Sequence, residues 1–120
     1  MKYLLAIIPP NVLHRVKDAL VGNHIHGLTV SEARGFGQEH DVTHPDYRDL
    51  PGVELTKKVR LEVVCHDEEV ERILQAFSAA AHTGHHGDGK VFVMPVLDVL
   101  RLKTGERGAK AIGPSSTETK

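Results

Sequence analysis

The first third of the chain begins with a continuous apolar run and goes on with apolar residues at the spacing of a helix. Residues 3–8 are apolar throughout, which predicts a strand buried on both faces, and two prolines end it. Asn11 is a good N-cap for the helix that follows. The apolar stripe of this helix consists of Val12, Leu13, Val16, Ala19 and Leu20. Alternation over residues 27–33 then predicts a second strand, which ends at a pair of glycines around Phe36.

The same order of elements returns in the second half of the chain. Residues 56–65 alternate and predict a strand. One face of this strand carries Val59, Leu61 and Val63, and the other carries Lys58, Arg60 and Glu62. Asp67 caps a second helix, with acidic residues in its first turn, where the helix dipole favours them. The apolar stripe of the second helix consists of Val70, Ile73, Leu74, Phe77 and Ala81.

Residues 91–93 predict a strand, and residues 97–102 a further strand or a short turn. The polar segment from Thr104 onward is expected to be mobile. The order is therefore β-α-β, a long loop, and β-α-β again. This order predicts an α+β fold of the ferredoxin-like βαββαβ kind, with an antiparallel sheet backed by two helices. The opposite face of the sheet must be covered, and self-association is the simplest way to cover it.

Residues 38–55 form the long loop, because no period is sustained there. A loop of this length is uncommon in a small domain and is usually functional or disordered. The rest of the 120-residue chain, which is 40% hydrophobic, suits one domain, placed at residues 1–112 and followed by a flexible tail at 113–120.

Composition excludes several classes of protein. A formal net charge of −1, with 2 tyrosines, 3 phenylalanines and no tryptophan, argues against a nucleic-acid binder. Cys65 is the only cysteine, which excludes an internal disulfide and a cysteine zinc cluster. The N-terminal apolar run is too short to span a bilayer and lacks the cleavage region of a signal peptide, so we expect a cytoplasmic protein.

Residues 83–90 gather three glycines, an acid and a lysine between the second helix and the following strand. Glycines allow the backbone to approach a ligand closely, and exposed N–H groups in such a turn bind anions. Lys90 adds a charge that suits phosphate. The same residues also suit a plain helix-to-strand connection with a glycine C-cap. The spacing of a Walker loop is absent.

Nine histidines raise the alternative of a metal site. They include the pair His24 and His26, the pair His40 and His44, and the group His82, His85 and His86. No His-Glu-x-x-His pattern is present, so surface histidines are the other interpretation. A nucleophile elbow is absent as well, and Asp88 either binds Mg²⁺ or holds the turn, so an enzyme is not expected.

Further residues favour an anion-binding cleft. Arg101 and Lys103 follow the glycine-rich stretch and are expected to lie near it in the fold. Gly35 and Gly37 form a second turn that permits close approach, and Lys58 begins the strand after the long loop. Two glycine turns and four cations around one cleft suit the phosphate chain of a nucleotide.

With these residues in place, the chain resembles the PII signal-transduction family. Residues 83–96 match the C-terminal signature of that family, with Thr83, the Gly-Asp-Gly-Lys run at 87–90 and Val96 at the signature positions. Residues 6–8, 27–32, 35–37, 58–62 and 101–106 are similar to further segments of the family, in the same order. The resemblance runs from Met1 to about Ile112, the long loop excepted.

The resemblance implies a non-enzymatic homotrimer that senses ATP against ADP, often with 2-oxoglutarate, in three clefts between subunits. By this likeness the phosphates are held by Gly87, Asp88, Gly89, Lys90, Arg101 and Lys103. The base and ribose are contacted by Ile7, Gly27, Thr29, Gly35, Gly37, Glu62 and Val64, and the cleft is completed by Leu28, Gln38 and Lys58. Residues 38–55 correspond to the effector loop, which docks on a transporter or an enzyme.

Several residues depart from the pattern of the family. The loop has Tyr47 but no second, modified tyrosine, so uridylylation is not expected. Glu39 stands where a glutamine helps to hold magnesium and 2-oxoglutarate, and Pro9 stands where a lysine is expected. Gln38 and Lys103 replace arginines, and lysine loses bidentate geometry.

These departures affect the γ-phosphate and 2-oxoglutarate end of the cleft. We therefore expect ADP and AMP to bind at least as well as ATP, with Mg²⁺ as an accompanying ion, and 2-oxoglutarate to bind weakly or not at all. A small anion such as bicarbonate, held by Lys58 and loop N–H groups, is an alternative second ligand that would link the protein to inorganic carbon. Three other hypotheses stay open: an ordinary nitrogen regulator, a trimeric metal-binding protein like the copper-tolerance proteins, and a nucleotide hydrolase.

Overall fold

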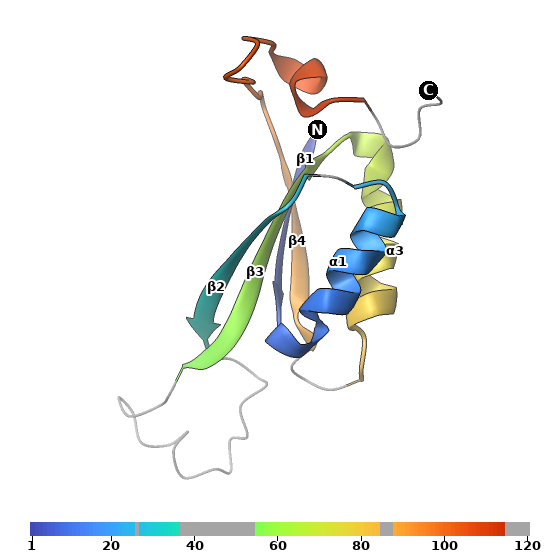
Figure 1. Cartoon of the computed structure of the whole chain (residues 1–120), viewed down its shortest axis with the longest axis vertical. Coiled ribbons are helices and arrows are strands. Elements are labelled where there is room, and N and C mark those ends of the chain that lie inside the picture. Colours follow the sequence, from blue (N-terminus) through green and yellow to red (C-terminus); the bar gives the residue numbers. More distant parts are fainter. Residues whose placement is uncertain (26, 37–54, 85–87, 115–120) are drawn as a thin grey trace.

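The computed structural model describes residues 1–25, 27–36, 55–84 and 88–114 (Figure 1). Within these residues, four strands and two α-helices follow one another in the order strand, helix, strand, strand, helix, strand, with short 3-10 helices (η) beside them. The strands are β1 (Lys2–Ile8), β2 (Thr29–Gly35), β3 (Thr56–Cys65) and β4 (Lys90–Pro95). The helices are η1 (Pro10–Val12), α1 (Leu13–Gly22), η2 (Asp67–Glu69), α3 (Val70–Ala81) and η4 (Gly108–Ile112).

The four strands form one antiparallel sheet in the order β2-β3-β1-β4. Both helices pack side by side on one face of this sheet (Figure 1). The predicted ferredoxin-like βαββαβ fold is therefore confirmed. Among the described residues, no helix has the length and apolar character needed to cross a membrane.

The core lies between the sheet and the two helices. Alternate residues of β1, namely Leu4, Ala6 and Ile8, are buried there, whereas Ile7 is only half-buried. The prediction that residues 3–8 are buried on both faces is thus wrong for a single chain, because the helices cover one face only. The other face, called the open face below, still carries apolar side chains, among them Phe92.

The helix starts differ from the predicted caps. Pro9, with extended backbone, precedes η1, so Asn11 lies inside a 3-10 turn rather than at the N-cap of the helix. His66 takes the capping position predicted for Asp67, because its side chain accepts from the backbone N–H of Glu69 while the Glu69 carboxylate accepts from the backbone N–H of His66, 2.8 Å away. The cap thus gives the buried Glu69 carboxylate a hydrogen-bond donor.

The segment after β4 is more structured than the sequence suggests. Residues 97–102 form a turn rather than a strand, with one isolated bridge between Leu100 and Arg107. Residues 104–112, expected to be mobile, continue this turn into η4. His66 Nε2 lies 2.8 Å from the carbonyl oxygen of Gly113, which ties the end of η4 to the start of η2. Local polar contacts, rather than apolar periodicity, build this segment.

Candidate functional site

Strand alternation gathers seven of the predicted site residues on the open face of the sheet. Residues that pair directly across antiparallel strands share a face, and side chains alternate along each strand. Lys90 pairs with Ile7, Glu62 pairs with Thr29, and none of the four belongs to the buried core. By the same alternation, the residues on the open face are Ile7, Thr29, Gly35, Lys58, Glu62, Val64 and Lys90. Gly27 and Leu28 directly precede β2.

The end of the glycine-rich stretch packs directly onto β1. Gly89 has a backbone φ of +100°, which residues other than glycine rarely adopt. A Cβ atom at this position would overlap the carbonyl oxygen of Ile7. The close approach lets Lys90 begin β4 in register with Ile7. The glycine at position 89 therefore allows Lys90 to start β4 on the open face of the sheet.

Asp88 holds the turn that precedes Gly89. Its carboxylate accepts hydrogen bonds from the Thr83 hydroxyl, from the Thr83 backbone N–H at 2.7 Å and from the Gly84 backbone N–H at 2.9 Å. These donors, the Thr83 hydroxyl first, lower the pKa of Asp88 to about 2. His82 Nδ1 lies 3.5 Å from the same carboxylate. Of the two roles proposed for Asp88, holding the turn is the one these contacts perform.

A polar network on the open face was not predicted from the sequence. The Tyr3 hydroxyl donates a hydrogen bond to Glu62, and Arg60 Nε lies 3.4 Å from the other carboxylate oxygen of Glu62. The three residues come from the neighbouring strands β1 and β3. Strand alternation correctly placed Arg60 and Glu62 on one face of β3, but only the strand register brings Tyr3 to them.

Arg101 and Lys103 do not lie near Lys90 within one chain, contrary to the prediction. Lys90 begins β4, and the segment that carries the other two cations leaves the far end of this strand, where the Val96 N–H donates to the Met1 carbonyl oxygen at 3.1 Å (Figure 1). A six-residue strand is about 17 Å long, so the two groups occupy opposite ends of the sheet. One phosphate chain can contact both groups only if they come from different subunits.

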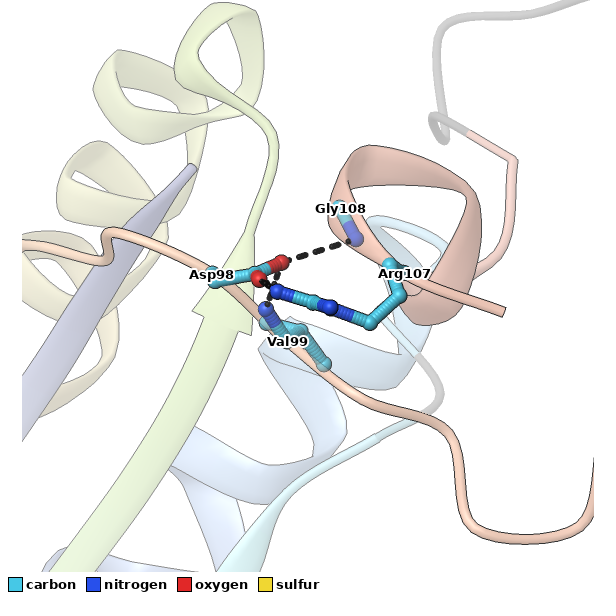
Figure 2. A network of polar contacts seen from close by, with 4 residues as sticks. All are labelled: Asp98, Val99, Arg107 and Gly108. Carbon is cyan, nitrogen blue, oxygen red and sulfur yellow. Dashed lines mark hydrogen bonds and ion pairs between the residues drawn. The ribbon is translucent and has the colours of Figure 1, made fainter. Parts of the chain in front are cut away.

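A hairpin of residues 98–108 presents these two cations. The Asp98 carboxylate accepts from the backbone N–H groups of Val99 at 2.8 Å and Gly108 at 3.1 Å, and from Nε and Nη2 of Arg107 (Figure 2). The Arg107 guanidinium, followed by the Val99 N–H, lowers the pKa of Asp98. Sequence analysis missed this pair, although an acid and an arginine on either side of the turn of residues 102–104 are a recognisable signal.

Some predicted residues lie outside the described part of the chain. They are the site residues Gly37, Gln38 and Gly87, the departure at Glu39, nearly all of the effector loop, and the histidines 26, 40, 44, 85 and 86. Among the residues that the structure does describe, no group of three histidine, cysteine, aspartate or glutamate side chains is arranged to hold a metal ion.

Two hollows flank the sheet. One of about 200 Å³ lies between α3 and the start of β4 and is lined by Ile8, Leu74, Phe77, Ser78, Ala81, His82, Asp88, Gly89, Lys90 and Val91. The other, of about 400 Å³, lies where β2 and β3 approach η1 and is lined by Pro10, Glu32, Ala33, Arg34, Lys57, Lys58 and Val59. The second hollow is rich in cations, with three basic side chains and one acidic side chain in its wall.

Comparisons with known proteins match nearly the whole chain. A family model described as Nitrogen regulatory protein P-II matches residues 1–106. The chain is 49% identical over 113 residues to a "Nitrogen regulatory protein P-II" of Azospirillum brasilense, with 93% of this chain and 100% of the relative covered. It is 45% identical to the protein of the same name of Rhizobium meliloti and 43% identical to that of Nostoc punctiforme, again over 93% of this chain and 100% of each relative.

Proposed function

Because the chain belongs to the Nitrogen regulatory protein P-II family, we propose that it is a regulator that binds adenine nucleotides in clefts between the subunits of a homotrimer. The family is one of regulatory proteins, so the expectation of a signal-transduction regulator rather than an enzyme is confirmed. The observation that carries the nucleotide proposal is the separation of Lys90 from Arg101 and Lys103. A phosphate chain held by all three needs at least two subunits.

The open face supports the trimer. It carries half-buried and exposed apolar side chains, including Val64 and Phe92, on the side of the sheet that no helix covers. A second copy of the chain would remove these side chains from water, and closed symmetric assemblies are the usual result. The predicted base and ribose residues lie on this same face, so trimer formation and completion of the clefts would be one event.

The phosphate-binding part of the cleft is built for ADP and AMP as well as ATP. Gly89 and Lys90 are held in place by β1, and Arg101 and Lys103 supply two further positive charges. We propose that 2-oxoglutarate binds weakly, because Pro9 caps a 3-10 turn where the family has a lysine, and Glu39 adds a negative charge. The relatives are named for nitrogen regulation. We therefore propose that this protein takes part in nitrogen regulation without a strong response to 2-oxoglutarate.

A small anion such as bicarbonate is a second candidate ligand. The hollow lined by Arg34, Lys57 and Lys58 supports it, because these three basic side chains outnumber the one acidic side chain in its wall, that of Glu32. Bicarbonate binding would be detected as a change in ADP affinity upon addition of the salt, with chloride at equal ionic strength as the control. No change in ADP affinity would contradict a coupled bicarbonate site.

The effector loop would act on a partner protein. β2 and β3 pair up to Gly35 and Thr56, so the two ends of the loop leave the sheet side by side. Phe36 and Leu55 at these ends are exposed apolar side chains. Exposed apolar residues beside a loop suit docking on a transporter or an enzyme, and the identity of that partner depends on residues 38–55.

Calorimetric titration with ADP of the wild type, of Lys90→Ala and of Lys17→Ala tests the proposal. Lys17 is a matched control, because it is an exposed lysine on α1. Loss of the Lys90 ammonium should weaken ADP binding by about tenfold or more, since a charge-assisted hydrogen bond contributes on this scale. Equal ADP affinity of Lys90→Ala and wild type would contradict the proposal. The metal-binding alternative would be favoured if the wild-type protein binds no nucleotide and if wild type and Lys90→Ala bind copper or zinc equally well.

A further inference from the structure

We propose that Asp98 and Arg107 are positioning residues for phosphate binding, because they close the hairpin of residues 98–108 and so orient Arg101 and Lys103. This inference rests on the proposed nucleotide site and assigns a role to two residues that do not themselves contact the ligand. Figure 2 shows the carboxylate of Asp98 between the two ends of the hairpin, with the Arg107 guanidinium and two backbone N–H groups directed at it.

The two carboxylate oxygens of Asp98 accept hydrogen bonds from different groups of the hairpin. Oδ1 accepts the backbone N–H groups of Val99 and Gly108, at 2.8 and 3.1 Å, and so joins the first residues of the hairpin to the last. Oδ2 accepts both Nε, at 2.8 Å, and Nη2 of Arg107. Hydrogen bonds to a charged acceptor are about twice as strong as neutral ones. One carboxylate therefore satisfies four donors from three residues.

Backbone hydrogen bonds continue the closure toward the tip. The Gly108 N–H also donates to the Val99 carbonyl at 3.0 Å, the Arg101 N–H donates to the Glu106 carbonyl at 2.9 Å, and the Gly105 N–H donates to the Arg101 carbonyl at 2.8 Å. Arg101 thus takes part in two of these bonds through its own backbone. These bonds fix the backbone at Arg101, and Lys103 lies in the turn that they close.

Burial contributes little to the hairpin within one chain. Leu97 is 95% exposed and Leu102 is 90% exposed, so neither of these apolar side chains anchors the segment within one chain. Without the Asp98 contacts, the backbone entropy regained by about ten residues would favour an open segment. Binding would then require that these residues be ordered again, and ordering costs affinity.

Among the described residues, only one of the three cations in the hairpin has an ion-pair partner. Arg107 is paired with Asp98, whereas no side-chain hydrogen bond or ion pair to a described residue involves Arg101 or Lys103. The pair therefore withdraws one of the three cations of the hairpin from ligand binding and leaves the other two available. Arg107 acts on the phosphates only through the shape of the hairpin, although its charge alone would suggest direct contact.

Four variants test the inference by titration with ADP and with adenosine, which lacks phosphates. Asp98→Ala removes the acceptor of all four donors, and Asp98→Asn keeps one oxygen for the two backbone N–H groups. Arg107→Ala removes only the ion pair. Asp18→Ala is the control, because Asp18 is an exposed, ion-paired acid on α1.

The expected result is a loss confined to the phosphates. Asp98→Ala should weaken ADP binding about tenfold, with smaller losses for Asp98→Asn and Arg107→Ala. Adenosine affinity should stay within about twofold of wild type in all variants, since Arg101 and Lys103 do not contact it. Asp18→Ala should match the wild type for both ligands.

Two results would overturn the inference alone: wild-type ADP affinity in Asp98→Ala, or equal fractional losses for ADP and adenosine, which would mean general destabilisation. If Asp98→Ala does not fold, Asp98→Asn and Arg107→Ala carry the same comparison. A wild-type protein that binds neither ligand would overturn the proposed function, and the inference with it. The failures of the two proposals are thereby distinguished.

Discussion

Lys90 and Arg101 stand at opposite ends of β4, because Lys90 opens the strand opposite Ile7 and Arg101 follows the point where Val96 bonds to Met1. Both residues are cations with exposed side chains. A nucleotide that contacts both must therefore lie between subunits, and each cleft must combine the start of β4 of one chain with the 98–108 hairpin of another.

Mixed trimers test this arrangement directly. Lys90→Ala and Arg101→Ala homotrimers should each bind ADP poorly. After refolding of a 1:1 mixture, a cleft is intact only where the chain that supplies Lys90 is the Arg101→Ala variant and the chain that supplies Arg101 is the Lys90→Ala variant. Random assembly gives half times half, about a quarter, of such clefts. Calorimetry should therefore show about a quarter of the wild-type number of tight sites. Absence of any tight site in the mixture would mean that both cations act within one chain.

The contact between Gly89 and Ile7 yields a second prediction. Gly89→Ala should destabilise the protein by about 1–3 kcal/mol, because alanine resists φ +100° and its Cβ overlaps the Ile7 carbonyl oxygen. Gly22→Ala is the matched control, since a Cβ at that position in α1 meets no atom within 4 Å. It should leave stability unchanged or raise it by up to about 1 kcal/mol. Urea unfolding measures both, and equal stability of the two variants would argue against the packed turn.

The fold followed from the sequence where periodicity carried the signal. Alternation in β3 correctly separated the buried Val59 and Leu61 from Lys58 and Glu62, and the glycines around Asp88 marked the turn that leads into β4. What periodicity could not give was the pairing of strands. Register, not spacing, places Ile7 beside Lys90 and leaves Arg101 at the far end.

The turn held by Asp88 should resist acid. Hydrogen bonds from Thr83, followed by that from Gly84, lower the pKa of Asp88 to about 2, whereas an unfolded aspartate titrates at about 3.9. A lowered pKa stabilises the folded turn fully above about pH 4, and this stabilisation disappears as the pH falls through about 2. An NMR titration of the Asp88 carboxyl carbon measures the midpoint. Thr83→Val, which removes the first donor, should raise it, and a wild-type midpoint near 4 would contradict the network.

Cys65 should be chemically inert in the folded protein. The thiol is 2% exposed, and burial, followed by the nearby Glu69 carboxylate, raises its pKa to about 11. Very little of the reactive thiolate therefore exists at pH 8. Iodoacetamide should modify Cys65 quickly in urea and hardly at all without it, as followed by mass spectrometry. Rapid labelling of the native protein would mean that the end of β3 opens readily.

His24 is a position where the sequence is not optimal for the backbone. Its φ is +65°, and the N–H groups of His24 and Ile25 bond to Val21 and Leu20 as in a Schellman motif, where glycine is preferred. His24→Gly should therefore stabilise the protein by about 0.5–1 kcal/mol. His14→Gly, within α1, should destabilise it by roughly 0.5 kcal/mol. Thermal unfolding distinguishes the two signs, and a loss of stability in His24→Gly would show that the imidazole has a stabilising role.

The parts of the site that sequence reasoning missed share a physical cause. Asp98 and Arg107 are nine residues apart, and Tyr3 and Glu62 are 59 residues apart. Neither pair leaves a periodic trace, because each contact depends on one polar side chain reaching another. Apolar periodicity reports which face is buried, but it does not report how a polar segment such as residues 98–108 is closed.

Calorimetric titration of the wild-type protein with ADP and with ATP, each alone and with 2-oxoglutarate and Mg²⁺, is the most direct test of the proposed nucleotide cleft. We expect three ADP sites per trimer, with an affinity for ADP that 2-oxoglutarate does not change. Absence of ADP binding would contradict the nucleotide cleft. A strong, mutual increase in the affinities for ATP and 2-oxoglutarate would contradict the assigned effects of Pro9 and Glu39.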